Sequence, residues 1–211
     1  LISIQKAVDN FKVLIEGSIL QGGIEAKEAM IRSSKPINCI HEAVKSALIN
    51  AGVQRQRIFP PLGASSPEMK LAGFLKHKHQ DVCVTPDGHK PENEIMQEGL
   101  LQEAADYYGK AYTERVLSIN IRSQMSSLAK NFDTLYERTI AEAQNLHVRC
   151  PKMVLGEIYM IAVKEYNPVA MKNKKVEFID KVGAVQKYIK SFQAINGRVD
   201  FTKEDYKYEK E

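Results

Sequence analysis

The pattern of hydrophobic and polar positions is clearest in the middle of the chain, where its period changes. Over residues 116–122 apolar and polar side chains nearly alternate, which is typical of a half-buried strand. Over residues 127–147 the apolar side chains recur every three to five positions, as they do on one face of a helix. We therefore predict a strand, a polar turn at 123–125, and a helix that the serine pair 126–127 can cap and Pro151 ends.

The rest of the chain continues this order of elements. We predict helices over residues 1–50 with a break at Gly22-Gly23, a helix over 66–75, a strand over 81–84, a helical insertion over 92–110, a strand over 153–163 and a final helix over 176–195. Ser66 followed by Pro67 is typical of a helix start, because proline fits the first helical position. The strand over 153–163 is apolar almost throughout, which predicts burial on both of its faces.

These elements indicate an α/β fold. A long helix between two strands normally forms a right-handed crossover between parallel neighbours. We expect a central mixed sheet flanked by helices, with helices on the sheet faces. The 211 residues, 44% of them hydrophobic, are enough for a single domain. That domain would comprise a mainly helical N-terminal region (1–64), an α/β core (65–165), and a C-terminal helix with a charged tail (166–211).

Composition narrows the classes of function. No apolar run reaches the length of a membrane span and nothing resembles a signal peptide, so we expect no membrane partner. Cys39, Cys83 and Cys150 are widely spaced, which indicates buried free thiols of a reducing cytoplasm. The net charge of +4 is compatible with nucleic-acid binding but does not argue for it alone. Because the first residue is Leu1 and not methionine, the sequence leaves open whether its N-terminus is complete.

Glu142 is the unusual residue of the predicted long helix. It follows Leu128 and Leu135 at intervals of seven, so it lies on the same side as these apolar residues. A carboxylate in such a place loses its hydration unless a positive group meets it. Arg138 one turn earlier, Arg122 on the preceding strand, or a metal ion are the alternatives that the spacing allows.

The order of elements resembles the PD-(D/E)xK nuclease core of type II restriction endonucleases. Asp81, with the apolar residues 82–84 after it, matches the first catalytic aspartate of that core, although Gln80 replaces the proline. Asp87 in the literal Pro86-Asp87 competes for this position, but the glycine after it indicates a turn. Glu68 resembles the accessory glutamate that some of these enzymes carry.

A variant of the family accounts for Glu142. The segment 118–123 followed by 142–146 resembles CCGG-type restriction enzymes, in which the second carboxylate lies on the crossover helix. The resemblance implies a Mg²⁺ ion held by Asp81 and Glu142, with Asn120 and Arg122 in the catalytic strand. The expected lysine is not there, since Ser118 occupies its place.

The missing lysine puts the mechanism in question. Its proposed work is to polarise the attacking water or to stabilise charge on the phosphorane. Arg122 can supply charge but is a poor proton acceptor. Lys76, Lys78 and Lys130 are alternatives for this role, and a chain that has lost catalysis would be a DNA-binding protein on the same fold. A hydrolase or transferase of small substrates is disfavoured, because GxSxG, HExxH and glycine-rich phosphate loops do not occur in the sequence.

The implied substrate is double-stranded DNA, cut at a defined sequence as part of a restriction-modification system. Cutting both strands of a symmetric site favours a homodimer or a higher homo-oligomer. A polar cluster at the start of the long helix suits a phosphate, although an ordinary N-cap arrangement explains it equally well. The predicted DNA contacts are Lys76, Lys78, Ser123, Gln124, Ser126, Lys130 and Asn131.

Overall fold

The computed structural model describes residues 1–180 and 182–196, and the chain divides into two compact units. The first unit contains residues 1–53, 121–130 and 159–188, and the second contains residues 54–120, 131–158 and the described residues from Ile189 onward. The charged tail lies outside the described residues. The single endonuclease domain over 1–211 stays a prediction.

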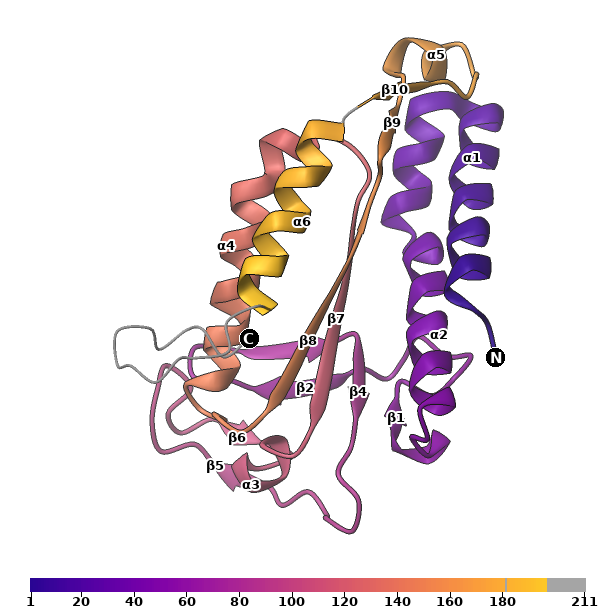
Figure 1. The fold of residues 1–211 in the computed structure, drawn as a ribbon. Helices are drawn as coiled ribbons and strands as arrows, with labels where there is room; N and C mark the ends of the chain where they lie inside the picture. The colour runs from indigo at the N-terminus through magenta and orange to yellow at the C-terminus, as the bar shows by residue number, and fades with distance from the viewer. Residues whose placement is uncertain (181, 197–211) are drawn as a thin grey trace. The chain divides into compact units, whose positions relative to one another are not determined.

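The N-terminal region is helical, as predicted. It contains α1 (Ile4–Arg32) and α2 (Lys35–Asn50), and the Ser3 side chain caps the first of them. Gly23 interrupts α1 with φ 67° and ψ −141°, and the chain reverses there (Figure 1). A side chain at this residue would lie 2.7 Å from the carbonyl oxygen of Met171, so both the conformation and the space require glycine. The buried apolar residues of the two helices include Ala7, Phe11, Ile15, Ile19, Ile40, Ala43 and Val44.

The C-terminal part begins differently from the prediction. β9 (Lys164–Tyr166) pairs antiparallel with β10 (Phe178–Asp180), and the short helix α5 (Pro168–Lys172) lies between them in the chain. The final helix α6 (Val182–Asn196) therefore begins six residues later than the predicted start at 176. Strand pairing with β9 takes the residues that the helical spacing had assigned to the first turns.

The central sheet is mixed and four-stranded, in the order β1-β4-β7-β8. Its strands are β1 (Ile58–Phe59), which follows the 3₁₀ turn η1 (Arg55–Arg57), β4 (Val82–Val84), β7 (Leu117–Gln124) and β8 (Val154–Ile161). The pairs β1·β4 and β4·β7 are antiparallel. The predictions of strands over 81–84 and 116–122 are confirmed.

The helix α4 (Leu128–His147) connects β7 to β8, as predicted. A side chain at Gly156 would lie 3.8 Å from the carbonyl oxygen of Ser118, and farther along the same strands the Ala162 amide donates to the Gln124 carbonyl. The numbers of the neighbouring residues thus rise together along β7 and β8, so these two strands are parallel. This confirms the connection through a long helix.

The predicted burial of β8 on both faces is wrong. None of its residues is fully buried, and Val154 is 60% exposed. The physical reason is the position of β8 at the edge of the sheet, where it has one neighbouring strand, β7. An apolar run does not distinguish an edge strand from a central one.

The predicted helix over 66–75 is also wrong, because this segment enters a hairpin. β2 (Met69–Ala72) pairs antiparallel with β3 (His77–Gln80). Met69 and Leu71 are buried while Lys70 between them is exposed, which is the period of a strand. Gly73 then lies so close to the Asn145 side chain that no Cβ fits there.

The insertion over 92–110 is not helical. β5 (Glu94–Ile95) pairs with β6 (Ala105–Asp106), and the only helical residues nearby form the single turn α3 (Lys110–Thr113). Gly99 has φ 78° and lies against the Phe74 carbonyl, so the chain turns sharply where the prediction required continuous helix. The hydrophobic core of the second unit lies among these elements and contains Met69, Leu71, Cys83, Tyr112, Val116, Leu146, Cys150 and Met153.

Candidate active site

Asp81 directly precedes β4, which pairs with β7, the strand that carries Asn120 and Arg122. In the antiparallel pair Val82 is opposite Ile119, so the next step of the same register brings Asp81 opposite Asn120. Opposite residues of an antiparallel pair project on the same face of the sheet. Asn120 Nδ2 donates a hydrogen bond of 2.9 Å to Glu157 Oε1 on β8. Asn120 and Glu157 thus meet across β7 and β8, and Asp81, one residue before β4, continues this row on the other side of β7.

Glu68 and His79 lie beside Asp81. The Glu68 carboxylate is 3.7 Å from His79 Nδ1. Partial burial and the charge of Asp81 raise the pKa of the Glu68 carboxyl, and the His79 imidazole opposes this rise. A cation between the two carboxylates would relieve their repulsion. The structure therefore brings together two of the predicted acidic residues, although Glu68 comes from a loop before β2 and not from a helix.

The next pair of residues on the same face of the sheet, Cys83 and Ser118, is buried and uncharged. Ser118, which occupies the place of the expected lysine, is fully buried, and its hydroxyl donates a 2.6 Å hydrogen bond to Gln80 Oε1. Burial raises the pKa of the neighbouring Cys83 thiol to about 12, so it stays protonated and is no nucleophile at neutral pH. Both Cys83 and Cys150 are buried free thiols, as predicted, whereas the free Cys39 is half-buried.

Glu142 has two cationic neighbours. It is 5% exposed, Arg138 Nε donates to its Oε1 at 2.9 Å, and its Oε2 forms an ion pair with Lys78 on β3. Of the three partners that the sequence allowed, Arg138 is thus present, and Lys78 is a partner that the helical spacing did not show. The ligation of a metal ion by Glu142 stays a prediction, and it would require the ion to compete with these two side chains.

The predicted DNA contacts fall into different environments. Lys76 is exposed between β2 and β3, whereas the Lys78 side chain is only 16% exposed against Glu142. The other candidates extend from the end of β7 into the first turn of α4, and they are Ser123, Gln124, Ser126, Lys130 and Asn131. All of them except Asn131 belong to the first unit, as does Arg122, whereas Asp81 belongs to the second unit. That one DNA phosphate contacts both this segment and Asp81 therefore stays a prediction.

The start of α4 already faces a carboxylate. The amide of Leu128, its first residue, donates to Glu165 Oε1 at 3.3 Å. The Gln124 side chain donates to the Ser126 carbonyl, and Ser127 adopts φ 55°. A glutamate of β9 thus meets this helix start, whereas capping by Ser126 or Ser127 stays a prediction.

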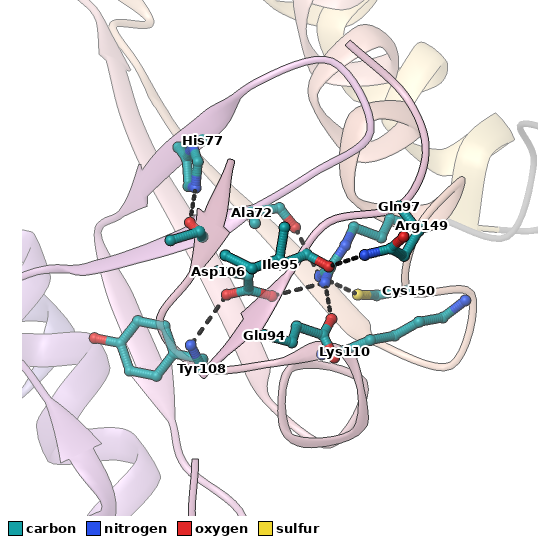
Figure 2. A network of polar contacts seen from close by, with 11 residues as sticks. Ala72, His77, Glu94, Ile95, Gln97, Asp106, Tyr108, Lys110, Arg149 and Cys150 are labelled. Atoms are coloured by element: carbon teal, nitrogen blue, oxygen red, sulfur yellow. Dashed lines mark hydrogen bonds and ion pairs between the residues drawn. The ribbon is translucent and has the colours of Figure 1, made fainter. Parts of the chain in front are cut away.

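An arginine network in the second unit was not predicted. Figure 2 shows Arg149, just beyond α4, directed at two carboxylates of the β5–β6 ribbon. Its Nη2 lies 2.8 Å from Asp106 Oδ2 and forms an ion pair with Glu94. The Arg149 side chain is 4% exposed and Asp106 is fully buried, so the network ties the ribbon to the end of the helix. A pocket of about 450 Å³ in the first unit and one of about 290 Å³ beside this network contain neither Asp81 nor Glu142.

Glu157 is the residue that sequence reasoning missed at the row itself. Its signal was a carboxylate within the otherwise apolar segment 153–163. In the described part of the chain no group of three histidine, cysteine, aspartate or glutamate side chains is arranged to hold a metal ion. Two carboxylates nevertheless fit Mg²⁺, because this ion is commonly bound through one or two carboxylates, water and substrate phosphates.

Comparison with protein-family models, curated proteins and solved structures finds no match to this chain. Among the helices formed by the described residues, none is both long and apolar enough to cross a membrane.

Proposed function

We propose that this protein is a Mg²⁺-dependent endonuclease that cuts double-stranded DNA at a defined sequence, as a type II restriction enzyme does. The observation that carries the proposal is the position of Asp81. Asp81 directly precedes β4, the second strand of the sheet, and lies beside Glu68. β4 pairs with β7, which is followed in the chain by the long helix α4 and then by β8, the parallel neighbour of β7. The order β4, β7, α4, β8 matches the part of the PD-(D/E)xK resemblance that begins at Asp81, whereas the β2–β3 hairpin stands where that resemblance placed a helix.

The chemistry requires an activated water and stabilisation of charge on the phosphate. Mg²⁺ would supply both, by lowering the pKa of a bound water and by neutralising phosphate charge. Asp81 and a second carboxylate would hold the ion. On β7, Asn120 and Arg122 are two residues apart, so they project to the same face of that strand. Asn120 orients a carboxylate, and Arg122 would add positive charge for the phosphate.

A catalytically degenerate DNA-binding protein is the second candidate. It is favoured by the composition of β7, which has serine at 118 and arginine at 122 but no lysine, and by the ion pair that holds Lys78 on Glu142. Either function would operate on duplex DNA, and a homodimer would present two sites to the two strands.

Incubation of the protein with plasmid DNA, with and without Mg²⁺, tests the proposal. We expect discrete linear fragments that appear only with the divalent ion and disappear with chelator. DNA binding without cutting in Mg²⁺ or Mn²⁺ would identify the degenerate protein. A protein that neither binds nor cuts DNA would exclude both.

Salt dependence of DNA binding tests which hairpin lysine contacts a phosphate. Each such contact releases counterions, so its loss lowers the slope of log K against log salt by about one. Lys76→Ala should weaken binding to all sequences alike and lower the slope by this amount, because Lys76 is exposed. Lys78→Ala is the matched control and should leave the slope unchanged, because Lys78 is held on Glu142. Fluorescence anisotropy over a series of NaCl concentrations measures both, and a lower slope for Lys78→Ala would contradict this assignment.

A further inference from the structure

A cavity of about 450 Å³ lies within the first unit. It is lined by the first part of α1, the turn after β7, the segment 160–166 and β10. Its volume is within the range of about 300–1,000 Å³ that is typical of small-molecule sites. Because every residue that lines the cavity belongs to this unit, the unit by itself forms it.

The interior of the cavity is apolar. Phe11 is 2% exposed and Tyr166 is 6% exposed, and the Tyr166 ring lies against Phe178 with the ring centroids 5.1 Å apart. Met125 and Met160 add unbranched side chains, which adapt to the shape of an apolar partner. Such a lining favours an apolar ligand, whose burial removes apolar surface from water.

Two lysines supply charge to the lining. Lys12 and Lys164 are both exposed, and none of the described residues that line the cavity is acidic. Carboxylates do lie nearby in the structure or the register. Lys12 Nζ is 3.8 Å from Glu16 Oε1, and Asp180 is the residue opposite Lys164 in the β9·β10 pair. Solvent-exposed ion pairs are weak, so an anion at the exposed side of the cavity can share the lysines with these neighbours.

The tyrosine in the lining stays neutral. Burial, together with the charge of Glu16, raises the pKa of Tyr166 to about 12. Its hydroxyl therefore keeps its proton at neutral pH and brings no negative charge into the cavity. The ionised groups of the lining are thus all positive, which is complementary to an anion.

We propose that this cavity binds an amphiphile with a carboxylate at the end of an unbranched apolar chain, as in a free fatty acid. The chain would occupy the apolar interior and displace water from it. The carboxylate would remain at the exposed side, where Lys12 and Lys164 lie. The proposal does not depend on DNA cleavage, since none of the residues predicted to act on DNA lines this cavity.

A ligand series with one chain length and three head groups tests the charge of the ligand. Isothermal titration calorimetry of the full chain with decanoate, below the concentration at which it forms micelles, should show one site per chain. Decan-1-ol and decylamine should bind at least about fivefold more weakly, because they lack the negative charge. Absence of decanoate binding would overturn the proposal, and so would equal or tighter binding of decylamine.

Lysine variants test where the carboxylate lies. Lys12→Gln combined with Lys164→Gln should weaken decanoate binding about fivefold to tenfold and leave decan-1-ol binding within about twofold. Lys6→Gln combined with Lys172→Gln is the control, because it removes the same charge from two exposed lysines of this unit that do not line the cavity. This control should bind decanoate as the wild type does. Equal losses in the two double variants would reveal general charge attraction and overturn the site.

A blocking variant tests where the apolar chain lies. Val8 lines the cavity and is 38% exposed, so Val8→Trp adds bulk at the cavity without a buried clash. We expect decanoate and decan-1-ol both to bind at least about tenfold more weakly. Val13→Trp on the same helix is the control, since Val13 is exposed but does not line the cavity. If Val8→Trp does not fold, Val163→Trp replaces it, and undiminished binding by a folded blocking variant would overturn the proposal.

Two further measurements distinguish other occupants of the apolar lining. A wild-type dimer that Val8→Trp converts to a monomer in sedimentation equilibrium, without decanoate binding, would identify an interface between copies of this chain. Cosedimentation with phosphatidylglycerol vesicles, without binding of decanoate in solution, would identify a membrane surface. Either result would overturn the proposal, whereas decanoate binding that the blocking variant alone removes would support it.

Discussion

Replacement of Asp81 by asparagine should reduce DNA cleavage by roughly 10³-fold while duplex binding remains measurable. The change keeps the size of the side chain and removes the negative charge that would hold the divalent ion beside the phosphate. Asp81 is only half-buried before β4, so we expect little change in melting temperature. Plasmid cleavage under single-turnover conditions and anisotropy without divalent ion measure the two effects separately.

Asp87→Asn is the matched control for this prediction. Asp87 is exposed and precedes Gly88, which has φ 67°, as expected of a turn. Cleavage should therefore be unchanged in this variant. Undiminished cleavage by Asp81→Asn, together with inactivity of Asp87→Asn, would assign the first carboxylate to Asp87.

Arg149→Met should lower the free energy of unfolding by about 3–5 kcal/mol, because it leaves a buried carboxylate without its cation. Asp106 is fully buried, and its Oδ2 lies 2.8 Å from Arg149 Nη2. The more exposed partner, Glu94, can be hydrated when the arginine is absent. Urea unfolding followed by circular dichroism measures the loss.

A double variant distinguishes loss of charge compensation from loss of packing. Adding Asp106→Asn to Arg149→Met removes the unpaired charge, while the new amide oxygen can still accept from the Tyr108 amide as Oδ1 does now. The double variant should recover most of the lost stability. If it is no more stable than Arg149→Met, then the arginine stabilises the β5–β6 ribbon through its apolar contacts and not through its charge.

Long segments with one clear period were predicted correctly. The alternation before residue 123 and the helical spacing after 127 identified β7 and α4, and the two strands on either side of α4 proved to be parallel neighbours. The double glycine at 22–23 marked the reversal within the N-terminal helices. These signals are local, since a half-buried strand and an amphipathic helix each record in their own residues which face is buried.

Short segments were assigned wrongly because their partners decide their structure. Met69 to Ala72 contains enough apolar residues for either a strand or a helix, and its pairing with β3 selects the strand. The same holds for β5 and β6, which are two residues each and form strands by pairing with one another. Intrinsic propensity over so few residues is weaker than such tertiary contacts.

The sequence by itself determined the order strand, long helix, strand around α4, the position of Asp81 directly before a strand and the need of Glu142 for a positive partner. Only the tertiary structure decided that this partner includes Lys78 of β3, and that Glu157 accepts a hydrogen bond from Asn120. In both cases the two residues are far apart in the chain. Periodicity specifies the face on which a side chain lies, whereas the residue opposite it depends on strand register and on how helices pack, which no local pattern records.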